Sequence, residues 1–154
     1  MRITFYDARI SEDDNVMLVK EKAVNYGAEK LNNAQRVAEL AKNLLHLDKM
    51  AEEYCYMIAQ SCSCKVLGAF LISKGTVNAS LVSPREVFIR ALLVGAVQVI
   101  LCHNHPSGDA TPSKQDIAIT KQIKEAGKLL NINLADHVII AGDAYFSFGE
   151  AKLL

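Results

Sequence analysis

The chain has 154 residues, which is the length of a single domain with a substantial buried core. Hydrophobic residues make up 51% of the chain, and this share excludes an intrinsically disordered protein. The 17 basic residues equal the 17 acidic residues in number, so no excess of positive charge indicates a nucleic-acid-binding surface.

The sequence also favours a protein without a membrane partner. The N-terminus turns acidic at Ser11–Asn15, where a signal peptide would continue its apolar segment. The longest apolar run, Ala91–Cys102, is shorter than the roughly 20 residues that span a bilayer. We therefore expect a soluble, cytoplasmic protein. In that compartment the cysteines are predicted to be free thiols rather than disulfides.

Residues 1–27 are predicted to form an extension to a main domain that covers residues 28–154. In the extension, Ile3 and Phe5 alternate with polar residues, and Val16–Val19 is predicted to return as the second strand of a hairpin. The main domain then begins with a helix, capped by Asn32 or Asn33, whose apolar residues recur at helical spacing.

The rest of the chain mixes short strands with helices. The predicted strands are Glu53–Ile58, Val66–Ser73, Val77–Val82, Ala96–Cys102, Leu134–Ile140 and Tyr145–Phe148. The predicted helices are Arg85–Leu93, preceded by Pro84, and Ser113–Leu130. Ala96–Cys102 is rich in β-branched residues, which is typical of a central buried strand. Because strands and helices do not alternate strictly, the pattern predicts a mixed α/β fold.

The most informative segment, Cys102–Asp116, joins the buried strand to the long helix. His103 and His105 stand two residues apart at the exit of the strand, so their side chains share one face, roughly 6–7 Å apart. Asp116 follows on the first turn of the helix, after a loop that lets the chain fold back. Two imidazoles and one carboxylate can bind one metal ion and leave a fourth tetrahedral position for water, as in catalytic zinc sites.

Each part of this segment also has a purely structural interpretation. A histidine at a strand end is usually a polar residue at the rim of a sheet. Ser113 and Asp116 also fit a capping box, in which both side chains only satisfy helix N–H groups. The conjunction favours a metal site, because a capping box needs no paired histidines upstream.

At this point the sequence resembles a known family. The pattern His103-x-His105, seven residues, Ser113, two residues, Asp116 resembles the motif of the JAMM (JAB/MPN) zinc hydrolases, and the whole of residues 103–116 resembles their RadC branch. Further likeness lies in Gly75-Thr76, Ser83–Phe88, Asp136-His137 and Ser147–Glu150. The resemblance covers about residues 30–154.

The resemblance implies both a fold and a cofactor. The fold is a mixed β-sheet flanked by helices, with the layering of cytidine deaminases. The cofactor is one zinc ion per chain, held by His103, His105 and Asp116. A glutamate before an early strand is the implied general base, and Glu53 fits this position, with Glu52 as the adjacent alternative.

Two more residues have implied roles. Ser113 would donate a hydrogen bond to the oxyanion that develops on the substrate. Asp136 is predicted to support the site from outside by orienting a ligand imidazole. The implied reaction is cleavage of a peptide or isopeptide bond by a zinc-activated water, so the expected partner is a peptide or protein substrate.

The sequence departs from longer RadC-like proteins, which carry an N-terminal helix-hairpin-helix region that binds DNA. A DNA-repair role and a nucleic-acid partner therefore rest on family analogy alone. The alternative function is a metal-containing binding module in a DNA-associated complex, without catalysis. A nuclease is a weaker third hypothesis, because many nucleases use two metals with carboxylate-rich ligands. The exposed edge of the N-terminal hairpin would allow a homodimer.

Overall fold

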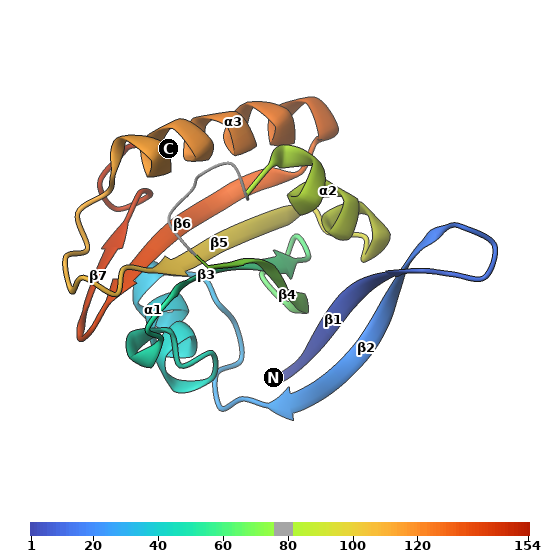
Figure 1. Ribbon diagram of the computed structural model, residues 1–154, viewed down its shortest axis with the longest axis horizontal. Helices are drawn as coiled ribbons and strands as arrows, with labels where there is room; N and C mark the ends of the chain where they lie inside the picture. The colour runs from blue at the N-terminus through green and yellow to red at the C-terminus, as the bar shows by residue number, and fades with distance from the viewer. Residues whose placement is uncertain (76–81) are drawn as a thin grey trace.

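The computed structural model describes residues 1–75 and 82–154. Within these residues the chain forms a seven-stranded sheet, three α-helices and one short 3-10 helix (Figure 1). The strands are β1 (Arg2–Ile10), β2 (Val16–Asn25), β3 (Glu53–Gln60), β4 (Val66–Gly75), β5 (Gln98–Asn104), β6 (Asn133–Ala141) and β7 (Ala144–Ser147). The helices are α1 (Ala34–Asn43), η1 (Leu47–Lys49), α2 (Pro84–Leu93) and α3 (Lys114–Leu130).

The sheet is mixed, with the strand order β2-β1-β4-β3-β5-β6-β7. β5 pairs with β6 in parallel, and β1 pairs with β4 in parallel, while the other neighbours are antiparallel. Parallel neighbours need a crossover, which α3 supplies between β5 and β6. This architecture confirms the predicted mixed α/β fold with a sheet flanked by helices.

The helices cover both faces of the sheet and so create two cores. α1 packs on one face and α2 and α3 on the other (Figure 1). Central strand β5 contributes to both cores because its side chains alternate. Ile100 and Cys102 face α1, whereas Val99 and Leu101 face α2 and α3. His103 continues the second series, which places it on the α3 side of the sheet.

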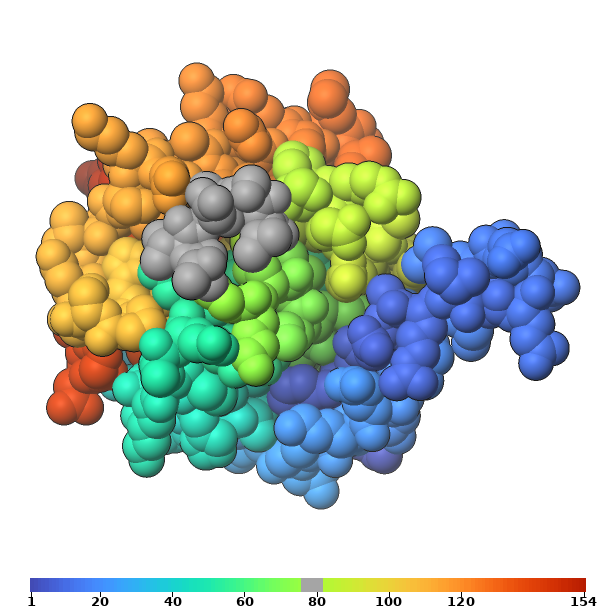
Figure 2. Space-filling view, viewed as in Figure 1, coloured from blue at the N-terminus to red at the C-terminus, as the bar shows by residue number. Residues whose placement is uncertain are grey.

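The N-terminal extension forms the predicted hairpin, and its strands are longer than predicted. β1 and β2 have 9 and 10 residues, and the register shifts at Phe5/Tyr6. One end of the hairpin extends past the rest of the molecule as an arm, drawn in blue in Figure 2. β1 also pairs with β4 through Phe5 and Ala69, so the sheet is continuous across the proposed boundary at residue 27. The division into two domains there remains a prediction.

Most predicted elements of the main domain are confirmed, with small shifts of their ends. The helix capped by Asn33, the two strands around residues 53–73 and the long helix after Ser113 all form. The predicted strand Val77–Val82 lies almost wholly outside the described residues. Among the helices of the described part of the chain, none has both the length and the apolar character that crossing a bilayer requires.

Candidate metal centre

His103, His105 and Asp116 meet at one point on the α3 side of the sheet. β5 ends at Asn104, a turn with Gly108 in a left-handed conformation (φ 82°) reverses the chain, and α3 brings Asp116 back in its first turn. The Nε2 atom of His103 lies 3.1 Å from Nε2 of His105 and 3.2 Å from Oδ1 of Asp116. The Nε2 atom of His105 lies 3.4 Å from Oδ2 of Asp116.

These spacings fit a metal ion. In a tetrahedral zinc site with bonds of about 2.0–2.1 Å, two ligand atoms are separated by about 3.3–3.4 Å. The 3.1 Å between the two Nε2 atoms and the 3.2 Å from His103 Nε2 to Asp116 Oδ1 are close to that edge length, and His105 Nε2 lies 3.4 Å from the other carboxylate oxygen, Oδ2. Within residues 1–75 and 82–154, the metal-ligating side chains that converge in this way are these three. His103, His105 and Asp116 can therefore hold a metal ion and leave one tetrahedral position open.

Ser113 fixes the orientation of the aspartate. Its backbone N–H donates to Oδ2 of Asp116 at 2.7 Å, and its hydroxyl donates to the same oxygen at 2.6 Å. The Asp116 N–H donates in return to the Ser113 hydroxyl, which completes a capping box. The structural and the metal-binding interpretations of this segment are thus compatible, because the cap occupies Oδ2 and leaves Oδ1 directed at His103. The predicted oxyanion contact of Ser113 remains a prediction.

Glu53 stands beside the three candidate ligands. β3 runs antiparallel to β5 with Cys55 opposite His103, so Glu53, two residues away, shares the face that carries the ligands. Burial raises the pKa of the Glu53 carboxyl, and the charges of His103 and His105 lower it. Neighbouring Glu52 instead forms an exposed ion pair with Lys74 at 3.8 Å. Of the two glutamates, Glu53 is thus the one on the ligand-bearing face, and its role as general base remains a prediction.

Asn104, which sequence reasoning did not single out, connects Glu53 to the ligand strand. Its Oδ1 accepts a hydrogen bond from the Tyr54 N–H at 2.8 Å, and its Nδ2 donates to the Glu52 carbonyl at 2.9 Å. Asn104 is 2% exposed, so these bonds are shielded from water. The side chain holds the start of β3 against the end of β5 and thereby positions Glu53 next to His103.

The prediction that Asp136 orients a ligand imidazole is wrong. Its carboxylate accepts hydrogen bonds from the N–H groups of His137 and Gly149 and from the Ser147 hydroxyl, on the α1 side of the sheet. Neighbouring residues on a strand point to opposite faces, so His137 rather than Asp136 faces the centre. His137 Nε2 lies 2.8 Å from His103 Nδ1. Burial, followed by the charge of His103, lowers the pKa of His137 well below its usual value, which keeps this imidazole neutral.

The electrostatics of the metal-free centre predict opposite effects of pH on stability and on metal binding. A hydrogen bond with Asp116 raises the pKa of His105, although burial lowers it. Because the pKa of His105 is higher in the folded chain than in the unfolded chain, its protonation stabilises the fold at pH values below the unfolded pKa of about 6.5. This stabilisation is lost as the pH rises through the folded-state pKa. Bound metal needs an unprotonated imidazole, so affinity increases over the same range, by about tenfold per pH unit for each proton displaced.

Thermal unfolding in a chelator and zinc titrations between pH 6 and 8 would measure the two effects. The His105→Ala variant should lose this part of the pH dependence of unfolding. Metal-free protein whose His105-dependent stability increased with pH over this range would contradict the assignment.

Cys62 is predicted to be far more reactive than Cys55 and Cys102. Burial, followed by the charges of Asp116 and Glu53, raises the pKa of Cys55 to about 12, and burial also raises the pKa of Cys102. Cys62 is exposed in the turn between β3 and β4. Because the thiolate is the reactive form, iodoacetamide at pH 8 should label Cys62 in the native protein and label Cys55 and Cys102 only after unfolding. Mass spectrometry of digests would show the sites, with Cys62→Ser as the control, and rapid native labelling of Cys102 would contradict the expectation.

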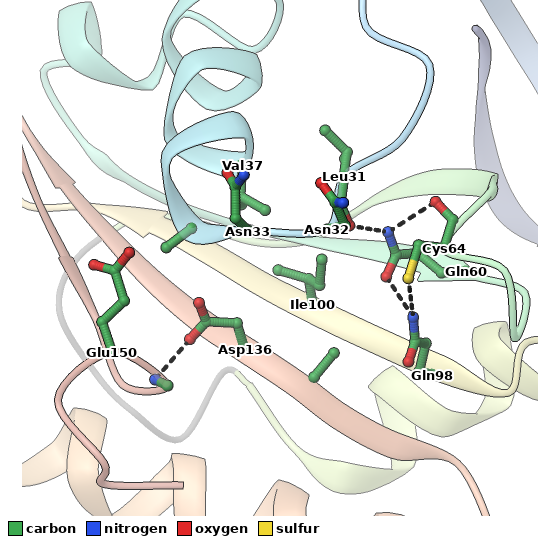
Figure 3. Close-up of a pocket in the computed structure, with 13 residues that line it drawn as sticks. Leu31, Asn32, Asn33, Val37, Gln60, Cys64, Gln98, Ile100, Asp136 and Glu150 are labelled. Atoms are coloured by element: carbon green, nitrogen blue, oxygen red, sulfur yellow. Dashed lines mark hydrogen bonds between the residues drawn. The ribbon is translucent and has the colours of Figure 1, made fainter.

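A pocket of about 370 Å³ lies on the other face of the sheet, beside α1 (Figure 3). Several of its polar side chains already form hydrogen bonds within the protein. Gln60 donates to the Leu31 carbonyl at 2.9 Å and accepts from Gln98 at 3.0 Å, while Asp136 accepts from Gly149 at the opposite end. The sheet separates this pocket from His103 and His105, so it is distinct from the metal centre.

Together, the fold and the converging ligands define a candidate metal-binding α/β domain. Comparison with known families identifies it further, since the model of the RadC-like JAB domain matches residues 31–153. The chain therefore belongs to the RadC-like JAB domain family.

Relatives in this family are curated as UPF0758 proteins. The chain is 40% identical to one from Thermotoga maritima over 122 residues, which cover 79% of the chain and 54% of the relative. It is 41% identical to one from Clostridium perfringens over 125 residues, covering 81% and 54%. A Clostridium botulinum relative is 54% identical over 76 residues, covering 49% and 33%. The chain thus spans about half the length of the first two relatives.

Proposed function

We propose that the chain is a zinc-dependent hydrolase that cleaves an amide bond in a peptide or isopeptide substrate. The observation that carries this proposal is the convergence of the two Nε2 atoms of His103 and His105 with the Asp116 carboxylate, at distances of 3.1–3.4 Å, with Glu53 on the same face of the sheet. Membership in the RadC-like JAB domain family supports the class of hydrolase. The set of two imidazoles and one carboxylate is also found in catalytic zinc sites.

The residues around the centre divide the chemistry between them. A bound zinc ion would lower the pKa of a water molecule toward about 7 and polarise the scissile carbonyl. Glu53 would accept the proton of the attacking water and return it to the leaving amine. The pKa of the Glu53 carboxyl is raised, because burial outweighs the opposing charges of His103 and His105. A raised pKa makes the carboxylate a stronger base, which suits a residue that accepts a proton from water.

Ser113 would stabilise the oxyanion by turning its hydroxyl toward the substrate. The hydroxyl now donates to Oδ2 of Asp116, and that oxygen would keep the bond from the Ser113 backbone N–H at 2.7 Å after the hydroxyl turns. The aspartate would therefore stay in place while the serine changes partner. Such a donor typically contributes a factor of about 10²–10³ to the rate.

Metal analysis and a cleavage screen test the proposal together. Purified chain is expected to contain one zinc ion per molecule by elemental analysis. A library of linear peptides and lysine-linked isopeptides should include a substrate that is cleaved by the zinc-loaded chain. Cleavage should stop with a chelator and return with added zinc. A chain that binds zinc but cleaves no amide in such a library would oppose the hydrolase assignment.

A further inference from the structure

The imidazole of His137 links a candidate ligand on β5 to the helix that carries another. His137 is 2% exposed, and its ring stacks on Phe148 with centroids 5.0 Å apart and planes 9° apart. Its Nε2 atom lies 2.8 Å from Nδ1 of His103, and its Nδ1 atom lies 2.6 Å from the Thr120 hydroxyl. Thr120 in turn lies 2.5 Å from the Asp116 carbonyl oxygen. His137 and Thr120 have not been assigned any role by the proposed function.

The Asp116 carbonyl oxygen, at the end of this series, determines the direction of each hydrogen bond in it. A carbonyl oxygen only accepts, so the single hydroxyl proton of Thr120 is donated to Asp116. The Thr120 oxygen is then an acceptor, and the Nδ1 atom of His137 must carry the proton that it receives. The His137 ring is buried, and its two nitrogens contact a histidine and a threonine rather than a carboxylate, so the imidazole is neutral. A neutral imidazole has one N–H, which leaves Nε2 of His137 as an acceptor. His103 must therefore donate from Nδ1.

This order of donors decides which nitrogen of His103 is available to a metal ion. With a proton held on Nδ1, the neutral form of His103 has its lone pair on Nε2, the atom that lies 3.1 Å from His105 Nε2 and 3.2 Å from Asp116 Oδ1. His105 is oriented in the same sense, because its Nδ1 atom lies 2.8 Å from the Asp109 carbonyl. Both imidazoles thus offer Nε2 to the centre. The series that begins at His103 also ends on Asp116, so it joins two of the three ligands into one closed ring of contacts.

We propose that Thr120 and His137 are positioning residues that hold His103 in the tautomer that leaves its Nε2 atom free to bind metal. The inference rests on the proposed function for the identity of the centre, but the hydrogen-bond order is a property of the metal-free chain. Partners that orient a ligand imidazole typically contribute a factor of about 10–100 to metal affinity.

Two variants of Thr120 separate the hydroxyl from the shape of the side chain. Thr120→Val removes the hydroxyl and keeps the volume, and it is expected to weaken zinc binding by about 10–100-fold in competition with a fluorescent chelator. Thr120→Ser keeps the hydroxyl and should bind zinc nearly as tightly as the unmodified chain. A buried hydroxyl outside the series, that of Ser147, gives the control, since Ser147→Ala should reduce thermal stability and leave zinc affinity unchanged.

His137 gives a second test with its own matched pair. His137→Gln places an amide oxygen where Nε2 accepts from His103, whereas His137→Leu provides no acceptor. Zinc affinity should therefore decrease in the order unmodified chain, His137→Gln, His137→Leu. Far-ultraviolet circular dichroism and thermal unfolding of the metal-free variants would show whether each one is folded.

The tautomer of His137 can be measured in the metal-free chain. In ¹⁵N-histidine NMR spectra of the metal-free chain, His137 should be neutral with its proton on Nδ1, and Thr120→Val should move that proton to Nε2. Finding the proton on Nε2 in the unmodified chain would overturn the inference, whether or not the chain binds zinc. Equal zinc affinities of Thr120→Val, Thr120→Ser and the unmodified chain would also overturn it. Absence of zinc binding by the unmodified chain would instead contradict the proposed function.

Discussion

Replacing Glu53 with glutamine is expected to reduce amide hydrolysis by about 10²–10⁴-fold while the zinc content stays at one per chain. Glutamine keeps the shape of the side chain but cannot accept the proton of the attacking water. Glu53 is not one of the three converging ligands, so its loss should leave metal binding intact. Elemental analysis and the rate of cleavage of a library-derived peptide, measured on the same preparation, would show the two effects separately.

Glu52→Gln provides the matched control for this experiment. The same chemical change one residue earlier removes only the exposed ion pair with Lys74, so the hydrolytic rate should remain close to that of the unmodified chain. Equal loss of activity in both variants would reject Glu53 as the general base. If Glu53→Gln left a cellular phenotype of the chain intact, a metal-containing binding module would be the better description of its role.

The second large effect is expected for metal-dependent stability. A zinc concentration of about 100 times the dissociation constant should stabilise the unmodified chain by about 2.7 kcal/mol, because the ion binds the folded state alone. His105→Ala removes one of three ligands and should abolish most of this stabilisation. Thermal unfolding with and without zinc would measure it. The metal-free variant should still fold, since His105 lies at the end of a strand and outside both cores.

His46→Asn is the control for nonspecific histidine effects. His46 is exposed, precedes η1 in a left-handed conformation (φ 55°) that asparagine tolerates, and lies outside the candidate centre. Its replacement should preserve the full zinc-dependent increase in unfolding temperature. An equal response of His105→Ala and the unmodified chain to zinc would remove His105 from the set of ligands.

The position of the candidate centre could be predicted from the sequence because its determinants are local. His103 and His105 are two residues apart at a strand exit, so strand geometry alone places them on one face. Asp116 is recognisable by its place in a capping box at the start of a helix. Each of these signals lies within a stretch of 14 residues, residues 103–116, and none depends on how distant strands pair.

The support around the centre could not be predicted because it depends on strand register. Asp136 and His137 are adjacent in a strand that is buried on both faces, so hydrophobic alternation does not reveal which of them faces α3. The pairing of Leu101 with His137 decides this, and it joins residues far apart in the sequence. The contacts of Asn104 with Tyr54 and Glu52 are also long-range, and they depend on the antiparallel pairing of β3 with β5.

The N-terminal hairpin shows a different limit of sequence reasoning. Alternation at Ile3 and Phe5 predicts a strand but gives no information about its neighbour. In the fold β1 lies beside β4, and the side chains of Ile3 and Phe5 enter the core under α1. The hairpin is thus a structural part of the sheet that carries Glu53 and His103.

The pairing of β1 with β4 has a practical consequence for anyone who shortens the chain. A version restricted to residues 31–153 would retain all three candidate ligands. Without β1, however, β4 would become an edge strand with unpaired backbone N–H and C=O groups. Gly68 on that strand would lose the Tyr6 ring and be covered by the Phe70 ring alone. We expect such a fragment to aggregate in solution even if it still binds metal.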